Sequence, residues 1–314
     1  MQDNTDHGGT GKVMQEILIR AGCFIAIILL GYSLKKFGFF KEEDFKLLSK
    51  IVIKITLPAS IVFSFAGKAV DPSMLALAAL GLGCGLVYVV IAWFINRKRG
   101  KERQAFEMLN TAGYNIGNFT MPFVQSFLGP TGVITTSLFD TGNAFICLGG
   151  AYSAASIVKD GGRFSVKRIA KSLIKSIPFD CYVIMTTLCL TGIHLPAPVV
   201  SFAEIIANAN AFMAMLMIGV GFKLNSNKDQ IGSIVRILTV RYGMAVVFAL
   251  IFYYLMPFSL EIRQTLMILA FGPIASAAPA FTGEIRSDVG LSSAVNSLSI
   301  IISIVCIVTI LLLI

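Results

Sequence analysis

The chain has 314 residues, of which 56% are hydrophobic and only 14% are charged, and its mean hydropathy is +0.80. Soluble domains have roughly 25% charged residues, so this composition excludes an ordinary soluble protein and indicates a membrane protein. The formal net charge of +9 does not predict a nucleic-acid partner, because the basic residues gather in the loops between apolar segments.

Uncharged segments long enough to cross a bilayer as helices, about 20 residues each, recur along the chain. The sequence therefore predicts an all-α polytopic membrane protein, multi-pass in a cell membrane of the inner or plasma type. We expect residues 1–14 to be a disordered tail, followed without a cleavage site by the first span. Ten spans are predicted, over residues 15–38, 46–67, 72–95, 104–128, 131–157, 172–193, 200–223, 232–256, 262–285 and 290–313.

The basic residues predict how these spans are oriented. Loops that follow odd-numbered spans hold most of the Lys and Arg residues, whereas loops that follow even-numbered spans hold Lys68 and Arg263. Because Lys and Arg concentrate in short cytoplasmic loops, we expect the odd loops to be cytoplasmic and both termini to be extracytoplasmic. The basic residues of the odd loops are Lys35, Lys36, Lys41, Lys46, Arg97, Lys98, Arg99, Lys101, Arg103, Lys159, Arg163, Lys167, Arg168, Lys171, Lys175, Lys223, Lys228, Arg236 and Arg286.

The longest predicted cytoplasmic loop, residues 159–171, divides the chain into two halves of five spans each, 15–158 and 172–314. Because five is odd, a second half that resembles the first must be inverted in the membrane, as in many secondary transporters. The fourth span of each half contains a run of Gly, Pro and small or polar residues: NIGNFTMP ends at Pro122, and GPIASAAP ends at Pro279. Such runs are tolerated at membrane depth only where they are buried in protein or line a water-filled cavity.

These two runs predict broken helices that meet at an anion site. Proline suits the first turn of a helix, where its missing N–H is not needed, so we expect Pro122 and Pro279 to begin the second half-helix of each span. Glycine suits a helix end, which Gly117 and Gly272 then provide for the first half-helices. Because spans 4 and 9 enter from opposite sides, the positive N-terminal ends of both second half-helices are expected to meet near the midplane.

The broken fourth span carries a resemblance to a known family. Asn115, Gly117 and Pro122 form the pattern N-x-G-x-x-x-x-P, which resembles the fourth span of the auxin efflux carrier family with its PIN-type carriers. Other segments are similar to the second, the seventh and the ninth-to-tenth spans of that family: ITLPASIVFSF (55–65), FMAMLMIGVGF (212–222) and AAPAFTGEIRSDVGLSSAVNSLSIIIS (277–303). The resemblance covers residues 15–314, and the order and spacing of the motifs make it specific.

The resemblance implies a ten-span carrier of small organic anions that binds substrate where spans 4 and 9 cross and alternates access by moving one bundle against the other. It assigns contact with a substrate carboxylate to Asn115. Two features depart from the family: Thr120 replaces a usual Gly, and the long central loop of the plant carriers is missing. The short loop implies the bacterial branch, with dicarboxylates such as malate or malonate as substrates, beside an auxin-like acid.

Several residues near the breaks have both a functional and a structural interpretation. Asn115 and Asn118 either bind substrate or cap the broken helix. Ser276, at the matching level of span 9, either donates a hydrogen bond to substrate or permits close packing. Thr56 precedes Pro58 in span 2, where the proline either brings Thr56 to the site or only kinks the helix.

Asp140 lies about 12 Å inside span 5, close to the middle of a hydrocarbon layer roughly 30 Å thick. A carboxyl group at this depth is costly and is usually functional or paired. Asn143, three residues later, shares its helix face and is a further candidate for the binding site. Asp140 is a candidate carrier of a coupling proton, because burial favours the neutral form of a carboxyl group. The alternative is a structural ion pair with Arg241, at comparable depth in span 8.

No cofactor, metal site or enzymatic activity is predicted, because the six cysteines and two histidines form no ligand pattern and the chain has no Walker or hydrolase motif. The expected partners are a small organic anion and membrane lipids, with the basic stretch from Lys167 to Lys175 lying on an anionic leaflet. The oligomeric state is left open, with a homodimer as one alternative. A non-transporting sensor of the anion and an anion channel are the alternative functions.

Overall fold

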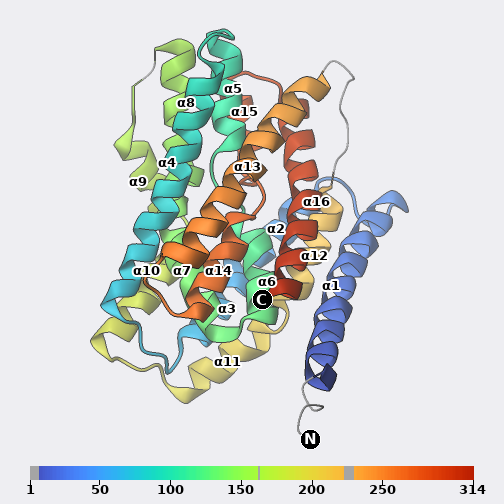
Figure 1. The fold of residues 1–314 in the computed structure, drawn as a ribbon, viewed down its shortest axis with the longest axis vertical. Coiled ribbons are helices and arrows are strands. Elements are labelled where there is room, and N and C mark those ends of the chain that lie inside the picture. Colours follow the sequence, from blue (N-terminus) through green and yellow to red (C-terminus); the bar gives the residue numbers. More distant parts are fainter. Residues whose placement is uncertain (1–6, 162, 223–229) are drawn as a thin grey trace, which may run out of the picture.

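The computed structural model describes residues 7–161, 163–222 and 230–314. Within these ranges the chain is helical, with short turns and one isolated antiparallel β-bridge between Tyr114 and Ile274. Figure 1 shows the long helices, among them α4, α13 and α16, running along the long axis of the molecule, with shorter helices between them. The described chain thus has the all-α character that its composition predicts.

The first predicted half contains both long helices and interrupted ones. Its elements are α1 (His7–Lys36), α2 (Asp44–Ile51), η1 (Val52–Thr56), α3 (Leu57–Phe65), η2 (Pro72–Leu75), α4 (Ala76–Asn96), α5 (Lys101–Thr111), η3 (Ile116–Thr120), α6 (Met121–Phe127), α7 (Gly129–Phe145), η4 (Ile146–Gly150) and α8 (Ala151–Asp160). The elements η1, η3 and η4 are π-helical turns, and η2 is a 3₁₀ turn. Isolated π turns inside helices often mark functional sites.

The second predicted half repeats the mixture of long and short helices. Its elements are α9 (Val166–Ile174), α10 (Ile177–Thr191), α11 (Ala197–Ala207), α12 (Asn210–Gly221), α13 (Ile231–Leu255), α14 (Leu260–Ala270), α15 (Ala278–Glu284) and α16 (Val289–Leu313). Helix α9 begins inside the predicted linker 159–171, where the side chain of Ser165 accepts a hydrogen bond from the backbone N–H of Arg168 and caps the helix.

Six stretches of the described chain are long and apolar enough to cross a membrane: Met14–Lys36, Asp44–Phe65, Pro72–Asn96, Ala197–Gly221, Ile231–Leu255 and Val289–Leu313. A seventh is obtained if α9 and α10, which meet at an angle of 77°, are counted as one bent span. These seven correspond to the predicted spans 1, 2, 3, 7, 8, 10 and 6. The predicted spans 4, 5 and 9 are composed of shorter helical segments.

The structure changes the predicted boundary of the N-terminal tail. Helix α1 begins at His7, so the segment 7–14, expected to be disordered, is helical, because an existing helix gains one hydrogen bond for each residue that extends it. The rest of the predicted tail, residues 1–6, lies outside the described residues. So do Lys223 and Lys228, which were counted among the basic residues of an odd loop.

The helices pack in two groups. The flanking group contains α1, α2, α3, α10, α11 and α12, in which α1 and α2 pack on α12, and α3 packs on α10 and α11. The crossover group contains the helices from α4 to α8 and from α13 to α16, with α4 on α7, α5 on α8, α13 on α14 and α15 on α16. The groups meet where α3 and α10 contact α7 and where α12 contacts α6. In Figure 1, α1 stands at the edge of the molecule beside α12.

Close helix contacts inside each group depend on glycine. A Cβ atom added at Gly81 of α4 would lie 2.0 Å from a backbone oxygen of α7, and one added at Gly142 of α7 would lie 1.8 Å from a backbone oxygen of α4. Likewise, a Cβ atom added at Gly31 of α1 or at Gly219 of α12 would collide with a backbone oxygen of the other helix. Small residues at such contacts let helix backbones approach, which is a principal source of stability inside a bilayer.

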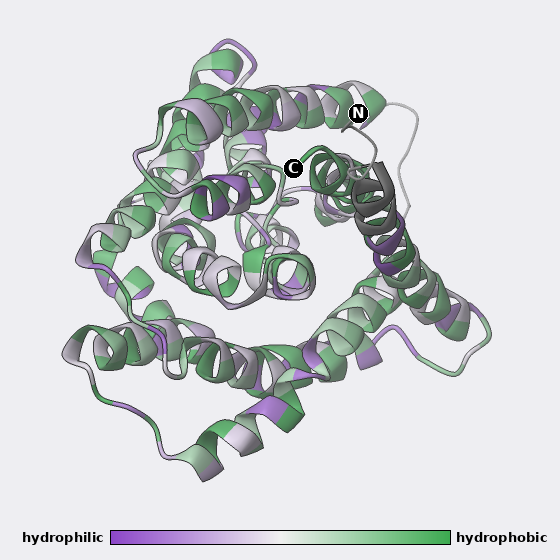
Figure 2. Cartoon of the chain, turned by 60° about the horizontal axis from the view of Figure 1, so that its bottom comes forward, coloured by the Kyte–Doolittle hydropathy of each residue, from purple (hydrophilic) through white to green (hydrophobic). Residues whose placement is uncertain are grey.

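Large apolar side chains cover the outside of the molecule. Leu29, Val90, Leu250 and Val305 are each at least half exposed, on four different long helices. Figure 2 shows hydrophobic residues along the outer helices and hydrophilic residues gathered at helix ends and loops. A water-soluble protein seldom exposes apolar surface so widely, whereas a bilayer favours it.

Candidate functional site

The breaks of spans 4 and 9 lie against each other. Helix α5 ends at Thr111 and α14 ends at Ala270. Between these ends and the next helices the two strands of chain run antiparallel: Tyr114 and Ile274 form the β-bridge, and the backbone N–H of Asn115 donates to the carbonyl oxygen of Pro273 at 2.8 Å. The structure therefore brings together the two segments that the sequence singled out.

The first break begins earlier than predicted. Gly113, and not Gly117, follows the end of α5, and its φ of +76° is a conformation that glycine adopts without strain. The second half-helix then starts with the π turn η3, in which the N–H of Thr120 donates to the carbonyl oxygen of Asn115 at 3.2 Å. Pro122 consequently lies inside this half-helix and not at its start. Its missing N–H is accommodated next to the π turn, where the regular hydrogen-bond ladder is already interrupted.

The second break follows the prediction closely. Gly272 comes two residues after the end of α14, and Pro279 lies in the first turn of α15. Pro122 is buried and Pro279 is partly exposed. Neither proline lines the cavity described below, so their contribution is to the backbone.

Asn143 of α7 holds the first break in place. Its side-chain oxygen accepts the N–H of Tyr114 at 3.0 Å, and its side-chain nitrogen donates to the carbonyl oxygen of Tyr114 at 2.9 Å and to Asp140 Oδ1 at 2.8 Å. Cys147 also donates to its oxygen. An amide has two donor hydrogens and two acceptor lone pairs, so Asn143 has little capacity left for a ligand.

Helix α16 holds the second break in a similar way. Ser299 accepts the N–H of Ile274 at 3.1 Å, and Asn296 donates to the carbonyl oxygens of Ile274 and Ala275 at 2.9 and 3.2 Å. The residues that face each other in the β-bridge are thus each fixed by polar side chains from the fifth predicted span of their own half, α7 in the first half and α16 in the second. The sequence gives no local signal for this backbone contact, because small polar residues in an apolar span are equally typical of close helix packing.

A cavity of about 220 Å³ lies at the crossover. Asn115, Gly117, Asn118, Ser276, Asp140 and Asn143 line it, together with Tyr182 and other residues of α10. The three π turns each contribute residues or flank it: Ile53 from η1, Ile116 from η3 and Cys147 from η4. The unusual backbone of the described chain is therefore concentrated around one cavity.

Two amide side chains of this cavity have unused hydrogen-bonding groups. The side chain of Asn115, a residue only 6% exposed, has no hydrogen-bond partner in the described part of the chain. Asn118 donates to the hydroxyl of Ser276 at 3.2 Å, which links the two breaks, but its Oδ1 is buried without a partner among the described residues. Buried polar groups are normally satisfied, so these groups are available to a ligand.

Asp140 faces the cavity from α7. Its Oδ1 accepts from Asn143, and its Oδ2 accepts from the hydroxyl of Tyr182 at 3.0 Å, across the boundary between the two helix groups. A Cβ atom at Gly117 would lie 4.0 Å from Asp140 Oδ2, so the η3 backbone passes close to this carboxyl group. Tyr182 was not singled out from the sequence, where a lone tyrosine in an apolar span carries no signal.

The hypothesis of an ion pair between Asp140 and Arg241 is wrong. The guanidinium of Arg241 donates to the carbonyl oxygens of Thr111, Gly272 and Pro273 at 3.0, 2.8 and 3.3 Å. Similar predicted depth did not bring the two groups together: Arg241 bonds to carbonyl oxygens at the two breaks, whereas Asp140 bonds to Asn143 and Tyr182.

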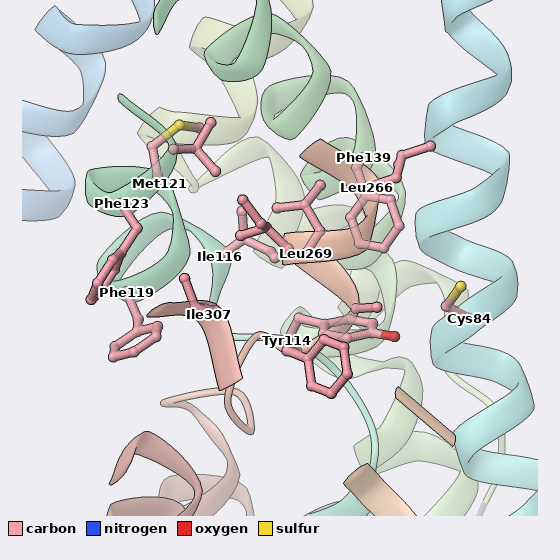
Figure 3. Close-up of a cluster of buried hydrophobic side chains, with 14 of the residues drawn as sticks. Cys84, Tyr114, Ile116, Phe119, Met121, Phe123, Phe139, Leu266, Leu269 and Ile307 are labelled. Atoms are coloured by element: carbon pink, nitrogen blue, oxygen red, sulfur yellow. The ribbon is translucent and has the colours of Figure 1, made fainter. Parts of the chain in front are cut away.

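Aromatic and aliphatic side chains surround the crossing backbone. Figure 3 shows Tyr114 near Phe139 of α7 and Leu269 of α14, and Phe119 and Phe123 of the second half-helix farther along the same cluster. All five are buried. This packing holds the backbone of the breaks next to the cavity, which Tyr114 also lines.

Thr56 lies outside the cavity. Its hydroxyl donates to Asn210 Oδ1 at 2.9 Å, and Asn210 donates to Gln125 at 3.2 Å. This buried chain joins spans 2 and 7 to α6. The proline that follows, Pro58, comes directly after the π turn η1.

Comparisons with known proteins agree with the geometry. A family model described as membrane transport protein matches residues 23–156. This region includes the first break, Asp140 and Asn143. The matched region is less than half of the chain, and it contains the second-span and fourth-span motifs by which the sequence resembles the auxin efflux carrier family.

Two curated relatives are also transporters by name. An uncharacterized transporter of Methanothermobacter thermautotrophicus is 26% identical over 210 residues, which cover 64% of this chain and 66% of the relative. An uncharacterized transporter of Methanocaldococcus jannaschii is 23% identical over 205 residues, which cover 62% of this chain and 65% of the relative. The match spans just under two thirds of each relative. The family model and both relatives are thus named for membrane transport.

Proposed function

We propose that the protein is a secondary active carrier of a small organic anion, built from ten spans in two inverted repeats of five, with its binding site at the crossover of spans 4 and 9. The paired breaks support this architecture, since each is the fourth span of its half. The matching contacts of Asn143 and Asn296, each in the fifth span of its half, also support it.

The observation that carries the proposal is the unused amide of Asn115 beside the cavity. A carboxylate accepting its N–H donors would form a charge-assisted hydrogen bond, which is stronger than a neutral one. The half-helix formed by η3 and α6 begins at the same place, and its positive end adds to the attraction for an anion. The unpartnered Oδ1 of Asn118 needs a donor, which a hydroxyl or a protonated carboxyl of the substrate provides.

Asp140 makes the carrier a proton-coupled one in this proposal. No Lys or Arg of the described chain lines the cavity, whereas Asp140 does. Two negative charges in one small, partly dehydrated cavity repel each other strongly, so an anion and an ionised Asp140 do not share it. Substrate binding and protonation of Asp140 therefore accompany each other, and the anion moves with a proton.

The cavity lies between the two helix groups, which suits alternating access. Leu57 and Tyr182 come from the flanking group, and Asn115, Asp140 and Ser276 come from the crossover group. The hydrogen bond between Tyr182 and Asp140 is one of the contacts between groups that must break or re-form if one group moves. In the proposed cycle the crossover group moves against the flanking group and carries the bound anion.

The proposal is tested with purified protein in liposomes, by uptake and counterflow against a panel of mono- and dicarboxylates that includes malate, malonate and an auxin-like acid. Saturable uptake with counterflow is the expected result. Flux without saturation or exchange indicates a channel, and binding without flux indicates a sensor. Asn115→Ala should lose most of its affinity for the transported acid and remain folded.

Orientation in the membrane is tested separately. We expect a fluorescent protein that matures only in the cytoplasm to stay dark when it is fused after Ile314, and an enzyme reporter active only outside the cytoplasm to be active at the same position. This expectation rests on the basic residues of the odd loops. The opposite result contradicts the predicted orientation.

A further inference from the structure

Arg241 is a buried cation at the centre of the crossover. It lies on α13 with 0% of its surface exposed, and no carboxylate in the described part of the chain forms an ion pair with it. An uncompensated charge at this depth is very costly. Its compensation must therefore come from the groups that it contacts.

Those groups are a carbonyl at the end of one helix and two carbonyls in the unwound segment that follows another. Thr111 is the last residue of α5, and Gly272 and Pro273 follow the end of α14. The last carbonyls of a helix have no partner within it, and each helix end carries roughly half a negative charge. The guanidinium of Arg241 bonds directly to the end of α5 and, through Gly272 and Pro273, to the unwound segment just after the end of α14, so its positive charge lies next to both negative helix ends.

Aromatic rings complete the surroundings of this cation. The guanidinium carbon lies 4.5 Å from the ring centre of Tyr88 and 4.1 Å from that of Tyr114. Both rings are within the range of a cation–π contact, which gains strength when water is excluded. Because Tyr114 is also the residue of the β-bridge, the cation is attached to both breaks at their crossing point.

Carbonyl ends of broken helices are the groups with which many secondary carriers coordinate a sodium ion. We propose that Arg241 is a built-in cation which permanently occupies such a site, so that this crossover neither needs nor binds a metal ion there. The part of the proposal that concerns sodium-independent transport rests on the proposed carrier function. The part that concerns the occupied cation site does not, because it is measurable on purified protein without any substrate.

The test replaces the side chain and offers a small cation in its place. Purified Arg241→Ala should have a thermal midpoint lower by about 10 °C, and millimolar guanidinium chloride should raise it saturably, because the free ion binds the vacated carbonyls. Choline chloride at equal concentration corrects for ionic strength. Wild type and Arg263→Ala should show no such rise. Arg263 is a matched control, since it also donates to a carbonyl and faces a tyrosine ring, but it is partly exposed at a helix start.

A second pair of variants separates charge from shape if Arg241→Ala does not fold. Arg241→Lys keeps the charge and Arg241→Gln keeps only hydrogen-bonding ability, so the Lys variant should be the more stable of the two. The proposal is overturned if Gln equals or exceeds Lys, or if guanidinium raises no midpoint of Arg241→Ala beyond those of the controls. It is also overturned if sodium, compared with choline, saturably stabilises the wild type. In liposomes the wild type should transport equally well in sodium and in choline. Absence of all transport contradicts the proposed function, and the stability measurements then still decide whether Arg241 occupies the cation site.

Discussion

At the first break of the crossover, Tyr114 is held by Asn143, whose amide also reaches Asp140; at the second, Ile274 is held by Ser299 and Asn296. The backbone arrangement of the two breaks is alike, but their side chains are not. The first break contributes Asn115 and Asn118 to the cavity, whereas the second contributes Ala275, Ser276 and Ala277.

This difference indicates a division of labour between the halves. Both breaks form part of the crossing backbone, and in both a backbone carbonyl accepts a hydrogen bond from Arg241. Groups that can recognise a ligand or carry a proton lie almost entirely on the first half, in η3 and α7. We therefore expect changes to cavity-lining polar residues of the first half to alter binding or coupling more than the equivalent changes in the second half.

The largest expected effect is that of Asp140→Asn. The variant should lose accumulation driven by a pH gradient completely and retain counterflow, because exchange of bound substrate does not require release of the proton. Uptake by the wild type should rise as the pH on the substrate side falls, since a proton enters with the anion, and this dependence should vanish in the variant. The amide still accepts from Asn143 and donates to Tyr182, so the fold should be kept.

Asp160→Asn, at an exposed carboxyl group at the end of α8, is the control for the Asp140 measurement and should accumulate substrate normally. A folded Asp140→Asn carrier that still accumulates substrate with the wild-type dependence on pH excludes Asp140 as the proton carrier. Its role would then be limited to the hydrogen bond with Tyr182.

The next effect compares ligand contacts across the two breaks. Asn115→Ala should weaken binding by about 10- to 150-fold, the cost of about 1.5–3 kcal/mol for a lost hydrogen bond to a charged group. Ser276→Ala should weaken it by less than about 10-fold, because the Ser276 hydroxyl already bonds to Asn118. Affinity is measured on purified protein by calorimetry or competition. Equal losses in the two variants contradict the division of labour.

A stability comparison concerns the residues that hold the breaks. Asn143→Ala leaves the N–H of Tyr114 and one oxygen of Asp140 without partners and leaves the Tyr114 carbonyl only its long contact with Cys147 Sγ, so it should lower the free energy of unfolding by about 3 kcal/mol. Asn296→Ala leaves the N–H of Ile274 bonded to Ser299, so its loss should be about 1–2 kcal/mol. Thermal unfolding in detergent measures both, with Thr309→Ala on the exposed face of α16 as control. The reverse order of stability indicates that the second break is the more demanding one.

The smallest effect is expected at Thr56. Thr56→Val removes its hydrogen bond to Asn210 and should lower stability by about 1 kcal/mol without changing affinity, because Thr56 does not line the cavity. A loss of affinity comparable to that of Asn115→Ala would show that Thr56 contributes to the binding site. Asn210 and Gln125 would then position Thr56 through their hydrogen bonds.

The sequence predicted the site in outline because its main signals are local. A run such as NIGNFTMP predicts an interrupted helix without knowledge of the fold, since Gly, Asn and Pro disfavour a continuous helix in an apolar span. The same reasoning placed Pro279 correctly in the first turn of α15. It misplaced the start of the other half-helix, because nothing in the local sequence distinguishes a π turn before Pro122 from an irregular loop.

Hydropathy, charge pattern and short motifs thus determined by themselves that the chain is a multi-pass helical membrane protein, that two of its helices are broken, and which family it resembles. Tertiary structure alone decided the partners of the buried polar groups. Arg241 and Thr111 are 130 positions apart, and Asn118 and Ser276 are 158 apart. Such contacts depend on how helices pack, and two residues at equal depth, such as Asp140 and Arg241, meet only if packing turns them toward each other. In this structure Arg241 bonds to carbonyl oxygens at the two breaks and not to the carboxylate of Asp140. These carbonyls are free to accept its hydrogen bonds because the interrupted helices leave them without partners inside a helix.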